Sequence, residues 1–67
     1  MAQIVHTLRG KAAYEAAVAY GDPLFIEPAG AKNDGSPASG VRVSPSSSEA
    51  KAMLTEAPER LACNVMD

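Results

Sequence analysis

Cysteine, histidine and tryptophan are scarce in this sequence of 67 residues, which holds one cysteine, one histidine and no tryptophan. A disulfide needs two cysteines, so Cys63 has no partner for one within the chain. A zinc site needs three or four Cys, His or carboxylate ligands, and one Cys with one His does not supply them. We therefore predict no metal, no cofactor, and a small fold stabilised by its own core or by association.

Charge of one sign and long apolar runs are also missing. Eight acidic and six basic residues give a net charge of −2, and they are scattered along the chain. Proteins that bind nucleic acid carry a basic stripe, so we do not expect nucleic acid as a partner. No segment approaches the roughly 20 apolar residues that span a bilayer, and the first residues do not resemble a signal peptide. We expect a complete small cytoplasmic gene product that does not bind a membrane.

The first third of the chain predicts a strand and then a helix. Residues 3–8 alternate between two faces and include β-branched side chains, and Gly10 ends the pattern. Residues 11–20 are rich in Ala and Glu, which favour helices, and Gly21 stands where a left-handed cap belongs. Helical spacing predicts an inward face made of Tyr14, Ala17 and Val18.

Proline and glycine divide the rest of the chain. Residues 24–26 form a short apolar run between two prolines, which favours a brief edge strand. Residues 29–40 contain three glycines and one proline, which predicts a flexible loop. Residues 41–44 alternate again and predict a third strand. A helix capped by a serine of the run before it should then end near Ala57, because Pro58 restricts the preceding residue.

Residues 60–66 leave two alternatives open: alternation suits a strand, and a short helix beginning at Pro58 also fits. With a strand, the element order is β-α-β-β-α-β, the ferredoxin-like order. We therefore predict a single α+β domain over residues 1–67: a small two-layer sandwich in which a four-stranded antiparallel sheet carries two helices on one face. Alternation assigns these strand residues to the inward side of the sheet: Ile4, His6, Leu8, Leu24, Ile26, Val41, Val43, Leu61, Cys63 and Val65.

The outward side of the sheet is the candidate site. Apolar and charged side chains alternate onto the face that the two helices would leave uncovered. Exposed apolar groups gathered beside a charge are typical of a contact surface, although single exposed apolar residues are common. We predict that a protein partner contacts Val5, Phe25, Glu27, Arg42 and Met66.

Cys63 and His6 are the one pair that could support nucleophilic catalysis. A thiolate nucleophile needs a base, an orienting group and access to substrate. Both side chains are predicted to face the core, where a cysteine acts as a small apolar residue. We therefore predict no catalytic residues and no enzymatic activity.

The function that this leaves is binding. We predict a small protein that inhibits or adapts a larger protein complex by direct contact. In size and character alone it resembles phage-encoded inhibitors of bacterial defence, including anti-CRISPR proteins. One alternative is a structural subunit of a homo-oligomeric or virion assembly, which would self-associate, whereas an inhibitor should stay monomeric or dimeric without its target. A Cys/His enzyme or redox protein is the other alternative, and it would show fast alkylation of Cys63.

Overall fold

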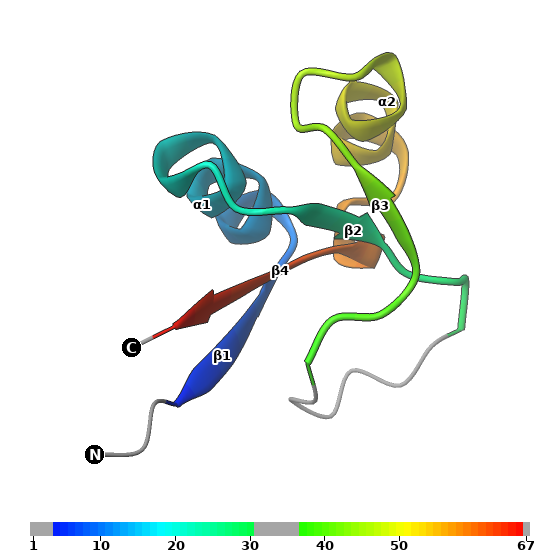
Figure 1. Cartoon of the computed structure of the whole chain (residues 1–67). Coiled ribbons are helices and arrows are strands. Elements are labelled where there is room, and N and C mark those ends of the chain that lie inside the picture. The colour runs from blue at the N-terminus through cyan, green and yellow to red at the C-terminus, as the bar shows by residue number, and fades with distance from the viewer. Residues whose placement is uncertain (1–3, 31–36, 67) are drawn as a thin grey trace.

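The computed structural model describes residues 4–30 and 37–66 of the chain (Figure 1). Its elements follow the predicted β-α-β-β-α-β order. Residues 61–66 form a strand, so the strand alternative holds for the C-terminal segment, and the helix that begins at Pro58 is a single 3₁₀ turn before it. In chain order the elements are β1 (Val5–Arg9), α1 (Lys11–Tyr20), β2 (Leu24–Ile26), β3 (Val41–Val43), α2 (Ser48–Glu56), η1 (Pro58–Arg60) and β4 (Leu61–Met66).

The four strands form one sheet in the spatial order β1-β4-β2-β3, and every neighbouring pair is antiparallel. It follows that β1 and β2 are parallel to each other with β4 between them. By the same reasoning β3 and β4 are parallel with β2 between them. Each helix therefore connects two parallel strands that are split by a third, which is the split βαβ arrangement. The last strand of the chain lies in the centre of the sheet. So does β2, which pairs with β4 on one side and β3 on the other, so the prediction of an edge strand over residues 24–26 was wrong. Pro23 and Pro28 lie outside this three-residue strand, so neither removes a hydrogen bond from its ladders.

Local sequence signals set the ends of the helices as expected. Gly21 has a φ of 72° and its N–H donates to the carbonyl of Ala17, which closes α1 with a left-handed cap. Ser47 caps α2, since its side chain accepts a hydrogen bond from the N–H of Ala50. The chain leaves α2 at Ala57, and Pro58 then occupies the first position of η1, where its missing N–H costs nothing.

Both helices pack on one face of the sheet, and the core between them is small. Three side chains of the central strands are fully buried there: Leu24, Leu61 and Cys63. The helices meet them with alanines, namely Ala13, Ala16, Ala17 and Ala50. Because alanine is short, the backbone of α1 comes close to the sheet. The prediction of an inward Val18 was wrong: its side chain is 60 % exposed, and Tyr14 is only half-buried.

Three residues predicted for the core lie in the open instead. Ile4 is 56 % exposed, Val41 is 64 % exposed, and His6 is also exposed. All three belong to the outer parts of the two edge strands or directly precede one. Figure 1 shows β1 beginning at a distance from α1 and reaching it only at its C-terminal end. Alternation in the sequence gives the side of the sheet correctly, but it carries no information about where the covering helix ends.

Candidate functional site

The outer face of the sheet, the side away from both helices, carries one row of side chains that crosses all four strands. The strand register aligns Arg9 with Ala62, Ala62 with Phe25, and Phe25 with Arg42. Ala62 is fully buried between its neighbours although no helix covers this face, and Phe25 is half-buried. Arg42, on the edge strand β3, is exposed. Two of the predicted contact residues, Phe25 and Arg42, are therefore cross-strand neighbours.

Glu27, a third predicted contact residue, is only 4 % exposed. Its carboxylate accepts two hydrogen bonds from Arg9, from Nε to Oε1 at 3.1 Å and from Nη2 to Oε2 at 3.4 Å. Its backbone carbonyl accepts a hydrogen bond of 2.7 Å from Nε of Arg60, and its N–H donates to the Arg60 carbonyl at 2.8 Å. Glu27 thus joins β1, β2 and η1, and its carboxylate faces Arg9 rather than the open surface.

Val5 and Met66, the remaining predicted contact residues, form a cross-strand pair at the other end of the β1–β4 ladder. They are 42 % and 58 % exposed. The Thr7–Asn64 pair lies between them and the row of Arg42. Asn64 Oδ1 accepts hydrogen bonds from Thr7 Oγ1 at 3.0 Å and from the N–H of Ala38 at 2.8 Å. The end of the predicted loop therefore lies against the outer face, and the predicted contact residues form two groups rather than one.

The structure describes only parts of the loop predicted over residues 29–40. Residues 31–36 lie outside the described part of the chain. The described C-terminal end of this loop contacts β4, because the N–H of Ala38 donates a hydrogen bond to Asn64 Oδ1.

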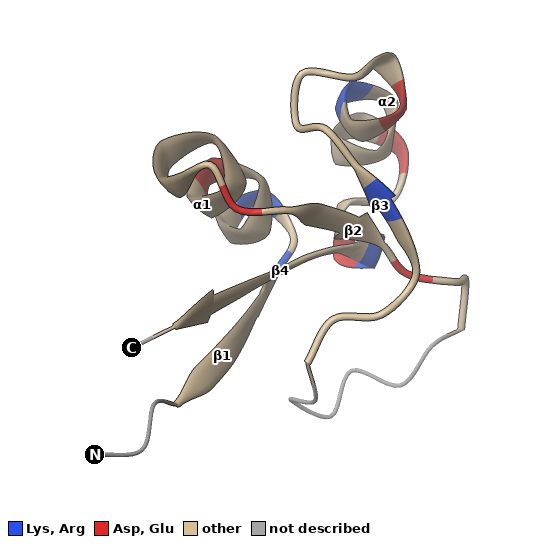
Figure 2. Cartoon of the chain, viewed as in Figure 1, with Lys and Arg blue, Asp and Glu red and all other residues tan. Residues whose placement is uncertain are grey.

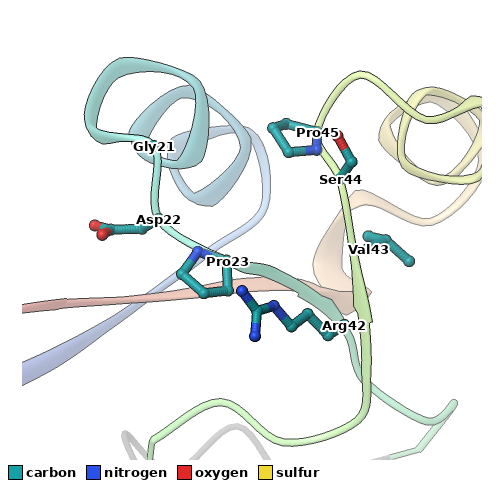
Figure 3. Close-up of a pocket in the computed structure, with 7 residues that line it drawn as sticks. All are labelled: Gly21, Asp22, Pro23, Arg42, Val43, Ser44 and Pro45. Carbon is teal, nitrogen blue, oxygen red and sulfur yellow. The ribbon is translucent and has the colours of Figure 1, made fainter.

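A pocket of about 390 Å³ opens beside Arg42, which we call the Arg42 pocket. Figure 3 shows that the Arg42 side chain extends toward Pro23, whereas Asp22 points away from it. Within residues 4–30 and 37–66, the Arg42 guanidinium has neither a hydrogen bond nor an ion pair. The walls of the Arg42 pocket come from the α1–β2 connection, from β3 and from the two residues after β3. These described residues line it: Gly21, Asp22, Pro23, Arg42, Val43, Ser44 and Pro45.

A second pocket, of about 470 Å³, lies at the end of α1 beside β1 and β4, and we call it the Tyr20 pocket. Met66, one of the predicted contact residues, lines it, and Asp22 borders both pockets. The described residues that line it are His6, Leu8, Tyr20, Asp22, Val65 and Met66. Neither Asp22 nor Tyr20 was predicted as a site residue. In the sequence Asp22 stands between a helix cap and a proline, and no local signal separates it from an ordinary loop residue.

The Cys63 thiol is buried between Leu8 and Leu24, its neighbours in the register. Burial, together with the negative charge of Asp22, raises the pKa of this thiol above its ordinary value. Both effects favour the uncharged thiol, which is the unreactive form. Over the described residues, moreover, no group of three or more His, Cys, Asp or Glu side chains is placed to hold a metal ion.

Charges of both signs are spread over the ribbon, as Figure 2 shows, and β3 carries a single basic position. No protein-family model, curated protein or solved structure matches the chain. No helix in the described part of the chain has the length and apolar character needed to cross a membrane. The surface around Arg42 and the Tyr20 pocket are therefore the features from which a function has to be inferred.

Proposed function

We propose that this protein acts by binding a larger protein, which it inhibits or adapts by contact without catalysis. The observation that carries the proposal is Arg42, an exposed guanidinium with no partner among the described residues. Arginine is enriched in protein interfaces because its planar group donates several hydrogen bonds and stacks on flat surfaces. A carboxylate or a carbonyl of the partner would satisfy it.

The surroundings of Arg42 support the same proposal. Phe25 lies opposite Arg42 in the register and offers a half-buried aromatic side chain on the outer face. The Arg42 pocket beside it has two prolines in its walls, and proline loses little conformational entropy when it is covered. An aromatic group, an arginine and a shallow pocket are the components of an interface centre. A phage-encoded inhibitor of a bacterial defence complex is one form that such a protein takes, and this remains a prediction.

The test uses affinity capture from a bacterial lysate, followed by measurement of affinity for any stoichiometric partner. We expect Arg42→Glu and Phe25→Ala each to weaken binding by at least about tenfold, the loss typical of an interface anchor. Lys51→Glu is the matched control, because it makes the same charge change at an exposed position of α2. Circular dichroism should show all three variants folded. Wild-type affinity in both Arg42→Glu and Phe25→Ala would refute this assignment of the surface.

Self-association is the second candidate, and one observation favours it. Exposed apolar side chains gather around the start of β1: Ile4, Val5 and Met66, and Tyr20 lines the same pocket as Met66. A contact between copies would cover them. Sedimentation velocity separates the two candidates, since a binder of another protein stays monomeric or dimeric and a structural subunit forms larger species as concentration rises.

A further inference from the structure

The Tyr20 pocket combines an apolar floor with a negative rim. Leu8, Val65 and Met66 provide the apolar part, from the two paired strands β1 and β4. Tyr20 and Asp22 form the rim at the end of α1. Its volume of about 470 Å³ falls within the range of small-molecule sites, and the pocket is partly open to solvent.

Three features make this rim electronegative. Helix α1 ends at Tyr20 with no basic residue in its last turn, so the partial negative charge of its C-terminus is not offset there. Asp22 follows two residues later, and within the described residues its carboxylate has no ion pair. Among the described residues, the pocket lining contains no lysine and no arginine, and His6 is its one basic side chain.

Tyr20 adds an aromatic surface to this charge. Its side chain is 73 % exposed, which leaves its ring accessible from solvent. A cation placed over a tyrosine ring is attracted by the negative face of the ring, by about 0.5–1 kcal/mol at exposed sites. Lysine and arginine also carry apolar stems that pack on surfaces such as the floor formed by Leu8 and Val65.

We propose that the Tyr20 pocket receives a lysine or arginine side chain of the protein partner, with the cation at Asp22 and Tyr20 and the stem on Leu8, Val65 and Met66. This rests on the proposed function, because it assumes a protein partner. It also gives the interface two sites of opposite charge preference. The chain offers a cation at Arg42 and accepts a cation at the Tyr20 pocket, with Asp22 in the wall of both pockets.

The probe is the capped tripeptide acetyl-Leu-Arg-Leu-amide, titrated into ¹⁵N-labelled protein with methyl signals of Met66 also followed by NMR. We expect saturable shifts at Tyr20, Asp22 and Met66, with smaller ones elsewhere. The same peptide with citrulline in place of arginine keeps the shape and loses the charge, so it should bind more weakly. Asp22→Asn should weaken the arginine peptide by at least about threefold, as for loss of a partly open ion pair.

Glu15→Gln is the matched control, because Glu15 is an exposed acid on α1 outside the pocket. It should bind the arginine peptide as the wild type does, and Tyr20→Leu should bind it more weakly. Equal binding of the citrulline peptide, or unchanged affinity in Asp22→Asn, would overturn the inference. The two proposals fail separately: Arg42→Glu should still bind the peptide, and a partner that needs Arg42 but tolerates Asp22→Asn would remove only the pocket assignment.

Discussion

The half of the sheet built from β1, β4 and α1 is packed very differently from the half built from β3 and α2. In the first half, three consecutive residues of β4 are fully buried, and α1 buries three alanines against them. In the second half, β3 has only three residues, two of them exposed, and α2 buries Ala50 alone. The two halves of the sheet therefore differ in how much apolar surface they bury. The central strands hold the fully buried large side chains, and the thinly covered edge leaves Arg42 exposed beside its pocket.

The largest expected effect on the free energy of unfolding comes from truncating a buried apolar residue in the first half. An exposed apolar residue in the second half serves as the comparison. Leu61→Ala in β4 should lower the free energy of unfolding by about 2–5 kcal/mol, since the fully buried side chain leaves a cavity. Val41→Ala in β3 should cost less than about 1 kcal/mol, because Val41 is 64 % exposed. A domain of this size has a total stability of only about 3–10 kcal/mol.

Urea denaturation followed by circular dichroism measures both variants. Leu61→Ala should unfold at a much lower urea concentration than the wild type, whereas Val41→Ala should keep a midpoint near that of the wild type. Similar losses in the two variants would show that the two halves are equally important for stability.

The second comparison is between two ion pairs. Glu27→Gln should cost about 1–3 kcal/mol, because the nearly buried carboxylate accepts two hydrogen bonds from Arg9. Glu15→Gln removes the exposed pair with Lys11, which is 3.9 Å long, and should cost less than about 0.5 kcal/mol. Thermal and urea unfolding measure both.

A double-mutant cycle that adds Arg9→Gln to Glu27→Gln isolates the energy of the pair itself. Coupling close to zero would mean that Glu27 acts only through its backbone hydrogen bonds to Arg60.

A third, smaller effect is expected at the start of α2. Ser47→Ala should cost about 1 kcal/mol, since the Ser47 side chain accepts from the N–H of Ala50 at 3.2 Å. Hydrogen exchange should show faster opening of the first turn of α2 while β4 keeps its protection. Ser48→Ala is the matched control one position later, and it should be nearly neutral. If β4 loses protection as well, the two halves unfold as one unit.

The smallest effect concerns the ionisation of Cys63. Burial raises the pKa of the thiol above its ordinary value of 9.0, so the unfolded chain loses this proton at a lower pH than the folded one. Below that value both states hold the proton and the group contributes nothing. As pH rises past it, stability should fall. Urea unfolding at about pH 8 and about pH 10 measures the change.

Cys63→Ala is the control for the other groups that titrate in alkaline solution, and it should fall less between these two pH values. At neutral pH, iodoacetamide should alkylate the folded wild type slowly and the unfolded chain quickly. Fast alkylation of the folded protein would instead support the Cys/His enzyme alternative.

Local signals in the sequence predicted a large part of the fold. The bounds of α1, the short length of β2, the serine cap of α2 and the role of Pro58 each depend on neighbouring residues, and each was confirmed. The edge position predicted for β2 was wrong, because strand order depends on distant segments. Burial at the ends of strands was harder to predict. Ile4 and Val41 alternate correctly and still lie in the open, because a strand pattern does not record how far a helix on another segment extends.

The positions of the predicted contact residues in the structure were only partly predictable from the sequence. Alternation alone placed Arg42 and Phe25 on the same face, and the register confirms that they are cross-strand neighbours. The burial of Glu27 was not predictable, because it depends on Arg9 and Arg60, which are 18 and 33 residues away in the chain. Asp22 was overlooked for a similar reason: it lines two pockets only because β1, β4 and β3 come to lie on either side of it.

By itself, the sequence determined the elements and their order, the sides of the strands, and the lack of cysteines for a disulfide within the chain. These follow from short-range preferences of the backbone and from simple composition. Only the tertiary structure decided that β4 lies in the centre of the sheet, that Glu27 is enclosed, and that Asp22 stands between two pockets. Those outcomes depend on contacts between residues far apart in the chain, and no local pattern encodes which distant segment will pair with which.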